Sequence, residues 1–367
     1  MVGMTESDLA DGASVGRSEL TRDNHYVPRS YLKRWADDCG RIWSYRILAS
    51  HQNVPLWKPQ STKGLAYHEH LYTRVVASGE TDDIERWIEK EFESPAKGSI
   101  HKAVSNEKLT ATDWQKLIRF LAAQDARTPA RLMKVLKRLH ETLPAIIEAT
   151  LADSVRKLEA AKHDGVSLSH ADHPHDEFFP GRVTVETFPE QEGGQLRFET
   201  VVGRGLWLFS LKQLLTKTVN ALLEHKWTIL RSPPGMEWLT SDDPVVCLNY
   251  HDAKKYDFGG GWGSKGTEIF LPLSPNHLMY TRIGEKPWPK GHVLSRELAQ
   301  SLQRFTVEHA HRFVFGRTQD PSVAAWRPRV VDSSTYDAEV KQWRQWHEDQ
   351  SNAERELFNT QRSSPLT

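Results

Sequence analysis

The chain has too few cysteines for a disulfide framework, because only Cys39 and Cys247 occur among its 367 residues. This scarcity excludes a disulfide-stabilised scaffold and a zinc site with four cysteines, and we expect no disulfide-linked partner. No apolar run approaches the roughly 18 residues that a membrane span requires. The first residues have neither the basic start nor the apolar core of a secretion signal. These absences predict a soluble, cytoplasmic protein that enters no membrane.

The chain also lacks an excess of charge of either sign, because 48 Lys and Arg residues balance 48 Asp and Glu residues. No overall field attracts it to nucleic acid or anionic lipid, so any such attraction has to come from local patches. What is present is typical of a folded globular protein: 38% hydrophobic residues, 26% charged residues and 13 tryptophans. This composition predicts an ordinary hydrophobic core.

The patterning divides the chain into three parts. Residues 1–23 are mostly small and polar and are expected to be disordered. Residues 24–317 are expected to form one domain, with a helical part at about residues 81–160 and a sheet part at about residues 181–317. Residues 318–367 are expected to form a polar tail, with an amphipathic helix at residues 338–357.

Apolar residues at helical spacing predict a layer of long helices in the central part. One helix is expected to start near Thr81. The next opens at Thr112, where Gln115 completes a capping box three residues later. A third helical stretch follows Pro144 and ends before the polar segment that starts at His163.

After about residue 180 the pattern changes to the alternation that is typical of strands. Two alternating segments on either side of Gly193 and Gly194 predict a hairpin at residues 183–188 and 196–201. Helices and strands that each gather in their own part of the chain predict an α+β fold with a mixed or antiparallel sheet, and argue against a doubly wound parallel sheet. Further strands are predicted at residues 227–230, 237–240, 245–248, 269–273, 278–283 and 312–315, and helices at residues 206–223 and 295–309.

The segment NHYVPRSYLKRW at residues 24–35 is distinctive, and other short segments follow it in a characteristic order. Together they resemble the signature of a widespread microbial family that is catalogued as domain of unknown function four-two-three-eight. The resemblance covers roughly residues 24–316. It implies a fold and the positions of motifs, but no activity. The accompanying segments are GRIWSY (40–45), LYT (71–73), IE (88–89), QDARTP (124–129), WTIL (227–230), LTSDDPV (239–245) and LPLSP (271–275).

Polar residues interrupt the apolar stripe of the second helix. At 100° per residue, Gln124, Asp125 and Thr128 fall on the stripe that leucines form before and after them. A buried polar group without a partner costs about 1–3 kcal/mol, so this turn requires either a hydrogen-bonded network or a wet cavity. Pro129 is expected to kink the helix there and so widen such a cavity. The alternative is a structural network that bends a helix.

Glu91 falls on the inner stripe of the preceding helix. An inward-facing carboxylate requires a cation, a metal or a group of donors. Arg127 and Arg131 flank the polar turn and could supply that cation, and a guanidinium also matches the geometry of phosphate or carboxylate. The alternative is a salt bridge between two helices.

His25 lies in the HYVP segment and is predicted to have an extended backbone. An imidazole can act as a general base, a metal ligand or a hydrogen-bond donor. The resemblance favours a functional role for His25, with Arg29 and Tyr31 as its companions. The alternative is a core histidine whose hydrogen bonds are satisfied.

Ser241, Asp242 and Asp243 place a hydroxyl and two carboxylates between two predicted strands, where magnesium sites are common. Asp243 departs from the family pattern, in which Asn is more frequent. Asp before proline is also ordinary turn chemistry. The acid-x-lysine strand of a restriction-type nuclease is not evident.

Two further clusters give weaker signals. His170, His173 and His175 have a spacing that could hold a metal, but their loop-like surroundings favour a surface tract. The glycine-rich residues 259–263 lack the strand-to-helix context of a phosphate cradle and are interpreted as a mobile loop.

These observations lead to the hypothesis of an active site between the helical layer and the sheet. A histidine, carboxylates and an arginine suit hydrolysis or transfer at a phosphodiester or phosphoanhydride, with magnesium or manganese as the metal. Such chemistry would fit a nuclease or a nucleotide-acting enzyme of a toxin or phage-defence system. The expected catalytic residues are His25, Glu91, Gln124, Arg127 and Asp242; the expected substrate-binding residues are Tyr26, Arg29, Thr128, Arg131 and Ser241; and the expected metal ligands are Asp242 and Asp243.

The main alternative is a non-enzymatic binding or regulatory module. In that case the same polar centre holds a small anionic ligand or a partner protein, or only fixes the packing of the helices on the sheet. A third hypothesis is a scaffold that recruits a partner through the helix expected at residues 338–357.

Overall fold

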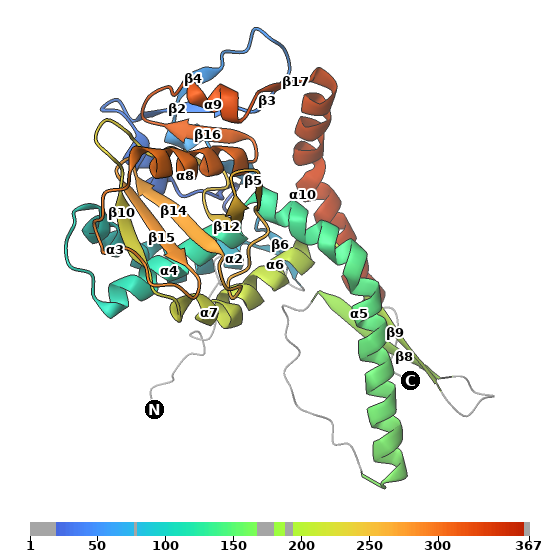
Figure 1. The fold of residues 1–367 in the computed structure, drawn as a ribbon. Coiled ribbons are helices and arrows are strands. Elements are labelled where there is room, and N and C mark those ends of the chain that lie inside the picture. The colour runs from blue at the N-terminus through green and yellow to red at the C-terminus, as the bar shows by residue number, and fades with distance from the viewer. Residues whose placement is uncertain (1–19, 77–78, 167–179, 188–193, 363–367) are drawn as a thin grey trace, which may run out of the picture.

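The computed structural model describes residues 20–76, 79–166, 180–187 and 194–362. Antiparallel sheets and packed helices form a body from which helix α5 and a hairpin extend (Figure 1), which confirms the expected α+β class. The expectations for residues 1–19 and for His170, His173 and His175 lie outside the described residues.

The α-helices are α1 (Arg29–Leu32), α2 (Asp83–Ile88), α3 (Ser94–Val104), α4 (Ala111–Ala126), α5 (Pro129–His163), α6 (Arg204–Gln213), α7 (Asn220–Leu223), α8 (Arg296–His309), α9 (Ser322–Trp326) and α10 (Ser333–Arg362). Short 3-10 turns are η1 (Lys33–Trp35) and η2 (Thr62–Gly64), and π-helical turns are η3 (Glu89–Glu93) and η4 (Leu214–Thr218).

A five-stranded antiparallel sheet has the order β10-β15-β14-β12-β13. Six of the seven residues of its central strand β14 are buried, because helices cover both faces of the sheet. Ile269 and Leu271 pack into the core that includes α4, whereas Phe270 packs with Leu302 and Phe305 of α8. The strands are β10 (Thr228–Arg231), β12 (Val246–Asp252), β13 (Lys255–Asp257), β14 (Glu268–Ser274) and β15 (His277–Arg282).

A four-stranded antiparallel sheet with the order β11-β16-β2-β4 joins the start of the chain to its C-terminal half. The remaining strands form two-stranded pairs, of which β1–β5 lies next to the HYVP segment and β8–β9 is the predicted hairpin. These strands are β1 (Asp23–His25), β2 (Arg41–Arg46), β3 (Leu48–Ala49), β4 (Trp57–Ser61), β5 (Tyr67–Glu69), β6 (Arg74–Val76), β7 (Gly79–Thr81), β8 (Gly181–Thr187), β9 (Gly194–Thr200), β11 (Thr240–Ser241), β16 (Phe313–Gly316) and β17 (Val330–Val331).

The short helix that follows the HYVP motif is anchored to both sheets. The Tyr31 hydroxyl donates to the Pro272 carbonyl oxygen at 2.6 Å and contacts the Thr240 hydroxyl at 2.8 Å. The Trp35 indole N–H donates to the Trp238 carbonyl oxygen at 2.7 Å. Because all three contacts are buried, they fix the N-terminal segment against the β11–β14 region.

Two helix predictions at the start of the helical layer are wrong in detail. The long helix does not kink at Pro129; it breaks, because α4 ends at Ala126 and Pro129 is the first residue of α5. Proline has no N–H to lose at that position and its fixed φ suits a helix start. The capping box is formed by Thr110 and Asp113, not by Thr112 and Gln115, because Asp113 reaches back to the Thr110 backbone N–H at 3.0 Å.

The predicted helical stretch after Pro144 is not a separate helix. Helix α5 runs through Pro144 without interruption for 35 residues, and most of its distal part is exposed. None of the described helices, α5 included, is long and apolar enough to cross a bilayer.

The helix expected at residues 338–357 is present and longer, as α10, and it packs along the body (Figure 1). Its main attachment is Arg204 at the start of α6, whose side chain is fully buried. Arg204 donates to Glu354 at 2.8 and 3.1 Å and to the Ser351 hydroxyl at 3.1 Å. Glu354 also accepts the Val75 backbone N–H at 2.9 Å. The buried ion pair between Arg204 and Glu354 holds α10 against the rest of the fold.

We predict that R204A lowers the free energy of unfolding by about 3–5 kcal/mol, because it leaves Glu354 buried without its cation. Urea denaturation of the full chain measures this change. The control is R355A, which removes the partly exposed ion pair between Arg355 and Glu80 and should cost less than about 1 kcal/mol. Equal losses in both variants would contradict the anchoring role of Arg204.

Candidate functional site

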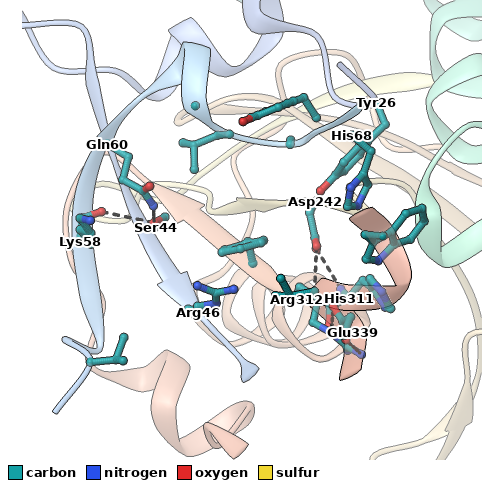
Figure 2. Close-up of a pocket in the computed structure, with 18 of the residues that line it drawn as sticks. Tyr26, Ser44, Arg46, Lys58, Gln60, His68, Asp242, His311, Arg312 and Glu339 are labelled. Carbon is teal, nitrogen blue, oxygen red and sulfur yellow. Dashed lines mark hydrogen bonds and ion pairs between the residues drawn. The ribbon is translucent and has the colours of Figure 1, made fainter. Parts of the chain in front are cut away.

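A pocket of about 780 Å³ lies between the HYVP segment, the four-stranded sheet and α10 (Figure 2). Tyr26 and His68 form one side, Arg46 and Lys58 come from strands β2 and β4, and Glu339 comes from α10. Segments that are far apart in the sequence therefore supply its walls.

His68 is held in a stack of three rings on one wall of this pocket. Its imidazole lies 3.8 Å from the Trp343 ring with an angle of 17° between the planes, and 5.6 Å from the Tyr26 ring with an angle of 23°. The β1–β5 pairing places His68 opposite Asn24, which brings it next to the HYVP segment. Burial lowers the pKa of His68 to about 4, so the imidazole is neutral at pH 7.

His311 is a second imidazole on the same pocket, in the turn between α8 and β16. Burial, together with the neighbouring Arg312, lowers its pKa to about 4. The turn is fixed by Asp242, whose two carboxylate oxygens accept the backbone N–H groups of His311 at 2.9 Å and Arg312 at 2.8 Å (Figure 2). Asp242 thus determines where the His311 ring can lie.

Asp242 is itself buried, and burial raises the pKa of its carboxyl to about 7, although the two backbone N–H groups lower it. The Asp242 carboxyl therefore changes its charge close to neutral pH.

The pocket carries both neutralised and free positive charge. The Arg312 guanidinium forms a two-pronged ion pair with Glu339 of α10, with N–O distances of 2.7 to 2.9 Å. Arg46 lies over the Tyr336 ring at 4.5 Å. Within the described part of the chain, Arg46, Lys58 and Arg344 have no ion pair, so three cations remain available to an anion in the pocket.

Gln124 and Arg127 lie behind the pocket and both hold the HYVP backbone. The Gln124 amide and the Arg127 Nε donate to the Tyr26 carbonyl oxygen at 2.7 and 2.9 Å. Arg127 is 1% exposed and also pairs with Glu93 at 2.6 Å, while its own carbonyl oxygen accepts the Tyr72 hydroxyl at 2.9 Å. The structure thus brings the predicted residues Gln124 and Arg127 together in a buried hydrogen-bond network, and neither lines the open pocket.

The carboxylate that pairs with Arg127 belongs to Glu93, not to Glu91. The prediction that Glu91 lies on the inner face of its helix is therefore wrong. The buried residues Ile84, Ile88 and Phe92 recur every four residues, because the π-helical turn η3 adds a residue to the helix. The extra residue rotates Glu91 away from the position that a regular helix predicts. Glu85 lies on the Arg127 side as well, and burial raises its pKa to about 8 even though Arg127 lowers it.

Ser241, Thr128 and Asp243 form a second buried cluster at the start of α5. The Thr128 hydroxyl donates to an Asp243 carboxylate oxygen at 2.8 Å, and the other oxygen lies 3.5 Å from the His309 Nε2. The Ser241 hydroxyl accepts the Asp243 backbone N–H at 3.2 Å. The residues that the structure describes contain no group of three or more histidine, cysteine or acidic side chains that could hold a metal.

The other predicted residues lie apart. The His25 Nδ1 contacts the Leu65 carbonyl oxygen at 3.1 Å, and burial lowers the pKa of its ring. Arg29 is exposed at the start of α1. Arg131 pairs with the buried Asp125 at 3.5 Å, and Asp125 accepts the Trp262 indole N–H at 2.8 Å.

Sequence reasoning missed most of the pocket, including His68, His311, Arg46, Arg312 and Glu339. A usable signal was present, because His68 and His311 each stand in a short histidine repeat, YHEH at residues 67–70 and HAHR at residues 309–312. The first repeat directly precedes the LYT motif of the resemblance. Nothing in their spacing indicated that the two repeats meet.

A family model described as "Protein of unknown function (DUF4238)" matches residues 23–320. The chain belongs to the DUF4238 family. The match contains Tyr26, His68, Asp242 and His311, and it ends before α10, so the part of the pocket wall that α10 supplies lies beyond it. No curated protein and no solved structure matches the chain.

We predict that R127A destabilises the protein by about 3–5 kcal/mol, because it leaves Glu93 without its buried cation and removes one of the two donors to the Tyr26 carbonyl. Thermal and chemical denaturation measure this loss. The control is R29A, which changes an exposed residue of the same motif region and should alter stability by no more than about 0.5 kcal/mol. An R127A protein with wild-type stability would contradict the structural role of this network.

We predict that His68 and His311 together lower the free energy of unfolding as the pH is lowered from 6.5 to about 4, whereas the buried carboxyls of Asp242 and Glu85, whose pKa values are raised, act in the opposite sense. The pKa values of His68 and His311 are about 4 in the folded protein against 6.5 for a free histidine, so these two side chains bind more protons in the unfolded chain in this window. Urea denaturation at several pH values measures the slope. The double variant H68Q/H311Q should remove the contribution of the two histidines, so that its stability at pH 4 relative to pH 6.5 is higher than that of the wild type, while H101Q, at an exposed position on α3, should leave the slope unchanged.

Proposed function

We propose that the chain is a cytoplasmic hydrolase that acts on a phosphodiester or phosphoanhydride in the pocket of His68 and His311. The observation that supports this most is that two neutral imidazoles face one pocket together with Arg46, Lys58 and Arg344. Imidazoles are the commonest proton-transfer groups in enzymes, and the cations suit the charge of a phosphate group.

In the proposed reaction the cations hold the phosphate and the imidazoles move protons. One neutral imidazole takes the proton of the attacking hydroxyl or water as the new P–O bond forms. The other imidazole, once protonated, gives its proton to the leaving oxygen as the old P–O bond breaks. A bound phosphate favours the charged form of a neighbouring imidazole, so it raises the pKa of both histidines toward the range where they act as acids.

Asp242 is proposed as a positioning residue, not as the general base. Its carboxylate holds the backbone of His311 and Arg312, and Arg312 is in turn held by Glu339. The three contacts fix the His311 side of the pocket without any direct contact between Asp242 and a reacting atom.

The expected magnesium or manganese site at Asp242 and Asp243 has a poor set of ligands. Asp242 already accepts two backbone N–H groups, and Asp243 is occupied by Thr128 and His309. The proposed chemistry therefore uses the side chains of the pocket alone.

A toxin or phage-defence nuclease would be consistent with this chemistry. The alternative function is a non-enzymatic module that holds a small anionic ligand or a partner protein. It is favoured by the ion pair of Arg312 with Glu339, which leaves fewer cations for catalysis.

We predict that the purified full chain cleaves RNA, DNA or a nucleotide, and that cleavage persists in EDTA. H68Q and H311Q should each lower the rate by about 10²- to 10⁴-fold, the usual contribution of one proton-transfer group. The measurement is the rate on end-labelled RNA and DNA and on nucleoside triphosphates, with and without Mg²⁺ or Mn²⁺.

The matched control is H101Q, which changes an exposed histidine outside the pocket and should keep the wild-type rate. Circular dichroism of each variant verifies the fold. Absence of cleavage under all conditions, or full activity in H68Q and H311Q, would refute the proposal. Saturable binding of a nucleotide without turnover would support the binding module instead.

A further inference from the structure

A second hollow, of about 340 Å³, lies between α5, α6 and the loop at residues 259–261. Helices α5 and α6 lie next to each other (Figure 1). None of the residues that line this hollow lines the pocket of His68 and His311. It is therefore a separate feature of the fold.

The charged side chains around this hollow all have the same sign. Arg131, Lys134 and Arg138 line it, and no aspartate or glutamate does. Positions three and seven residues apart share one face of a helix, and they spread the three cations over about 10 Å of its axis. Like charges repel one another, and among the described residues only Arg131 of the three has a carboxylate partner, so an anion close to Lys134 and Arg138 would stabilise the cluster.

One of the three cations is fixed in place and the other two are free. Arg131 is oriented by the buried Asp125, which is held in turn by the Trp262 indole N–H. Lys134 and Arg138 have no ion pair within the described ranges of the chain. The hollow thus combines a guanidinium that is paired with Asp125 and two cations without an ion pair among the described residues.

The opposite wall is apolar. Leu211 and Leu214 line it, together with Trp207, which is 1% exposed. The Trp207 indole Nε1 is buried and has no hydrogen-bond partner among the described residues. A buried N–H without an acceptor is unusual in a folded protein and costs free energy.

We propose that this hollow binds a small phosphorylated molecule with an apolar body. The phosphate would lie against Arg131, Lys134 and Arg138, and the apolar body against Trp207 and the two leucines. A volume of about 340 Å³ is at the lower end of the range for small-molecule sites, which suits a single-ring or two-ring compound.

The test uses the full chain and three probes: 1-naphthyl phosphate, inorganic phosphate and 1-naphthol. Isothermal titration calorimetry measures the three dissociation constants. The expected result is that 1-naphthyl phosphate binds at least about tenfold more tightly than either of its parts, because only this probe meets both walls. Its affinity should also fall with added salt.

The variants K134Q and R138Q should each weaken the binding of 1-naphthyl phosphate by about fivefold, as expected for partly exposed charge contacts. The matched control is K137Q, which removes an exposed charge of the same helix that does not line the hollow. Lys134 and Lys137 are both exposed, so neither K134Q nor K137Q should affect folding.

Three outcomes would overturn the proposal. They are no saturable binding of 1-naphthyl phosphate at millimolar concentration, equal affinity for 1-naphthyl phosphate and 1-naphthol, and equal weakening by K137Q and K134Q. If 1-naphthyl phosphate bound in the pocket of His68 and His311 instead, H68Q/H311Q would abolish binding and K134Q/R138Q would not. That result would also refute the proposed site between α5 and α6.

Discussion

The backbone carbonyl of Tyr26 accepts hydrogen bonds from two buried side chains, and the geometry of the first pocket depends on them. Gln124 and Arg127 hold this carbonyl from the helical layer. Because Tyr26 is fixed, the β1–β5 pair and the His68 ring that stacks on Tyr26 are fixed too. A buried guanidinium can serve this purpose only if its charge is compensated, and Glu93 supplies that compensation.

The break between α4 and α5 explains why so many polar groups are buried here. Ending one helix and starting another leaves backbone donors and acceptors without intrahelical partners. The Tyr72 hydroxyl satisfies the Arg127 carbonyl, and the Thr128 side chain caps the backbone N–H of Arg131. Thr128 then also reaches Asp243, which ties the break to the sheet. The polar residues between α4 and α5 thus have a structural role, because they connect the two helices to the sheet. The pocket lies on the side of this connection that faces the HYVP segment.

Local patterns were sufficient to predict most of the fold. Alternation and helical spacing located four of the five strands of the large sheet (all but β13), the β8–β9 hairpin, α8 and α10, since each depends on nearby residues. The same arithmetic placed Gln124, Asp125 and Thr128 on a buried face, which the structure confirms. It failed for Glu91 because a π-helical turn changes the number of residues per turn, and for Pro129 and Pro144 because a proline can begin a helix or lie within one.

The pocket could not be predicted in the same way. His68 and His311 line one pocket only because the fold brings together two segments that are far apart in the sequence, and burial in that fold lowers the pKa of both. The periodicity of apolar residues carries no information about contacts between segments that are far apart in the sequence. The family resemblance indicated the region, through the LYT motif next to His68, but not the residue.

The order of the chain also has a consequence for when the pocket becomes complete. Glu339 and Trp343 belong to α10, which follows every other wall of the pocket in sequence. Since a ribosome makes the chain from its N-terminus, a nascent protein that has not yet reached Ser333 holds both imidazoles but lacks the ring that stacks on His68 and the partner of Arg312. The pocket is therefore complete only after α10 has been translated, and a prematurely terminated product would carry the family motif without this wall of the pocket.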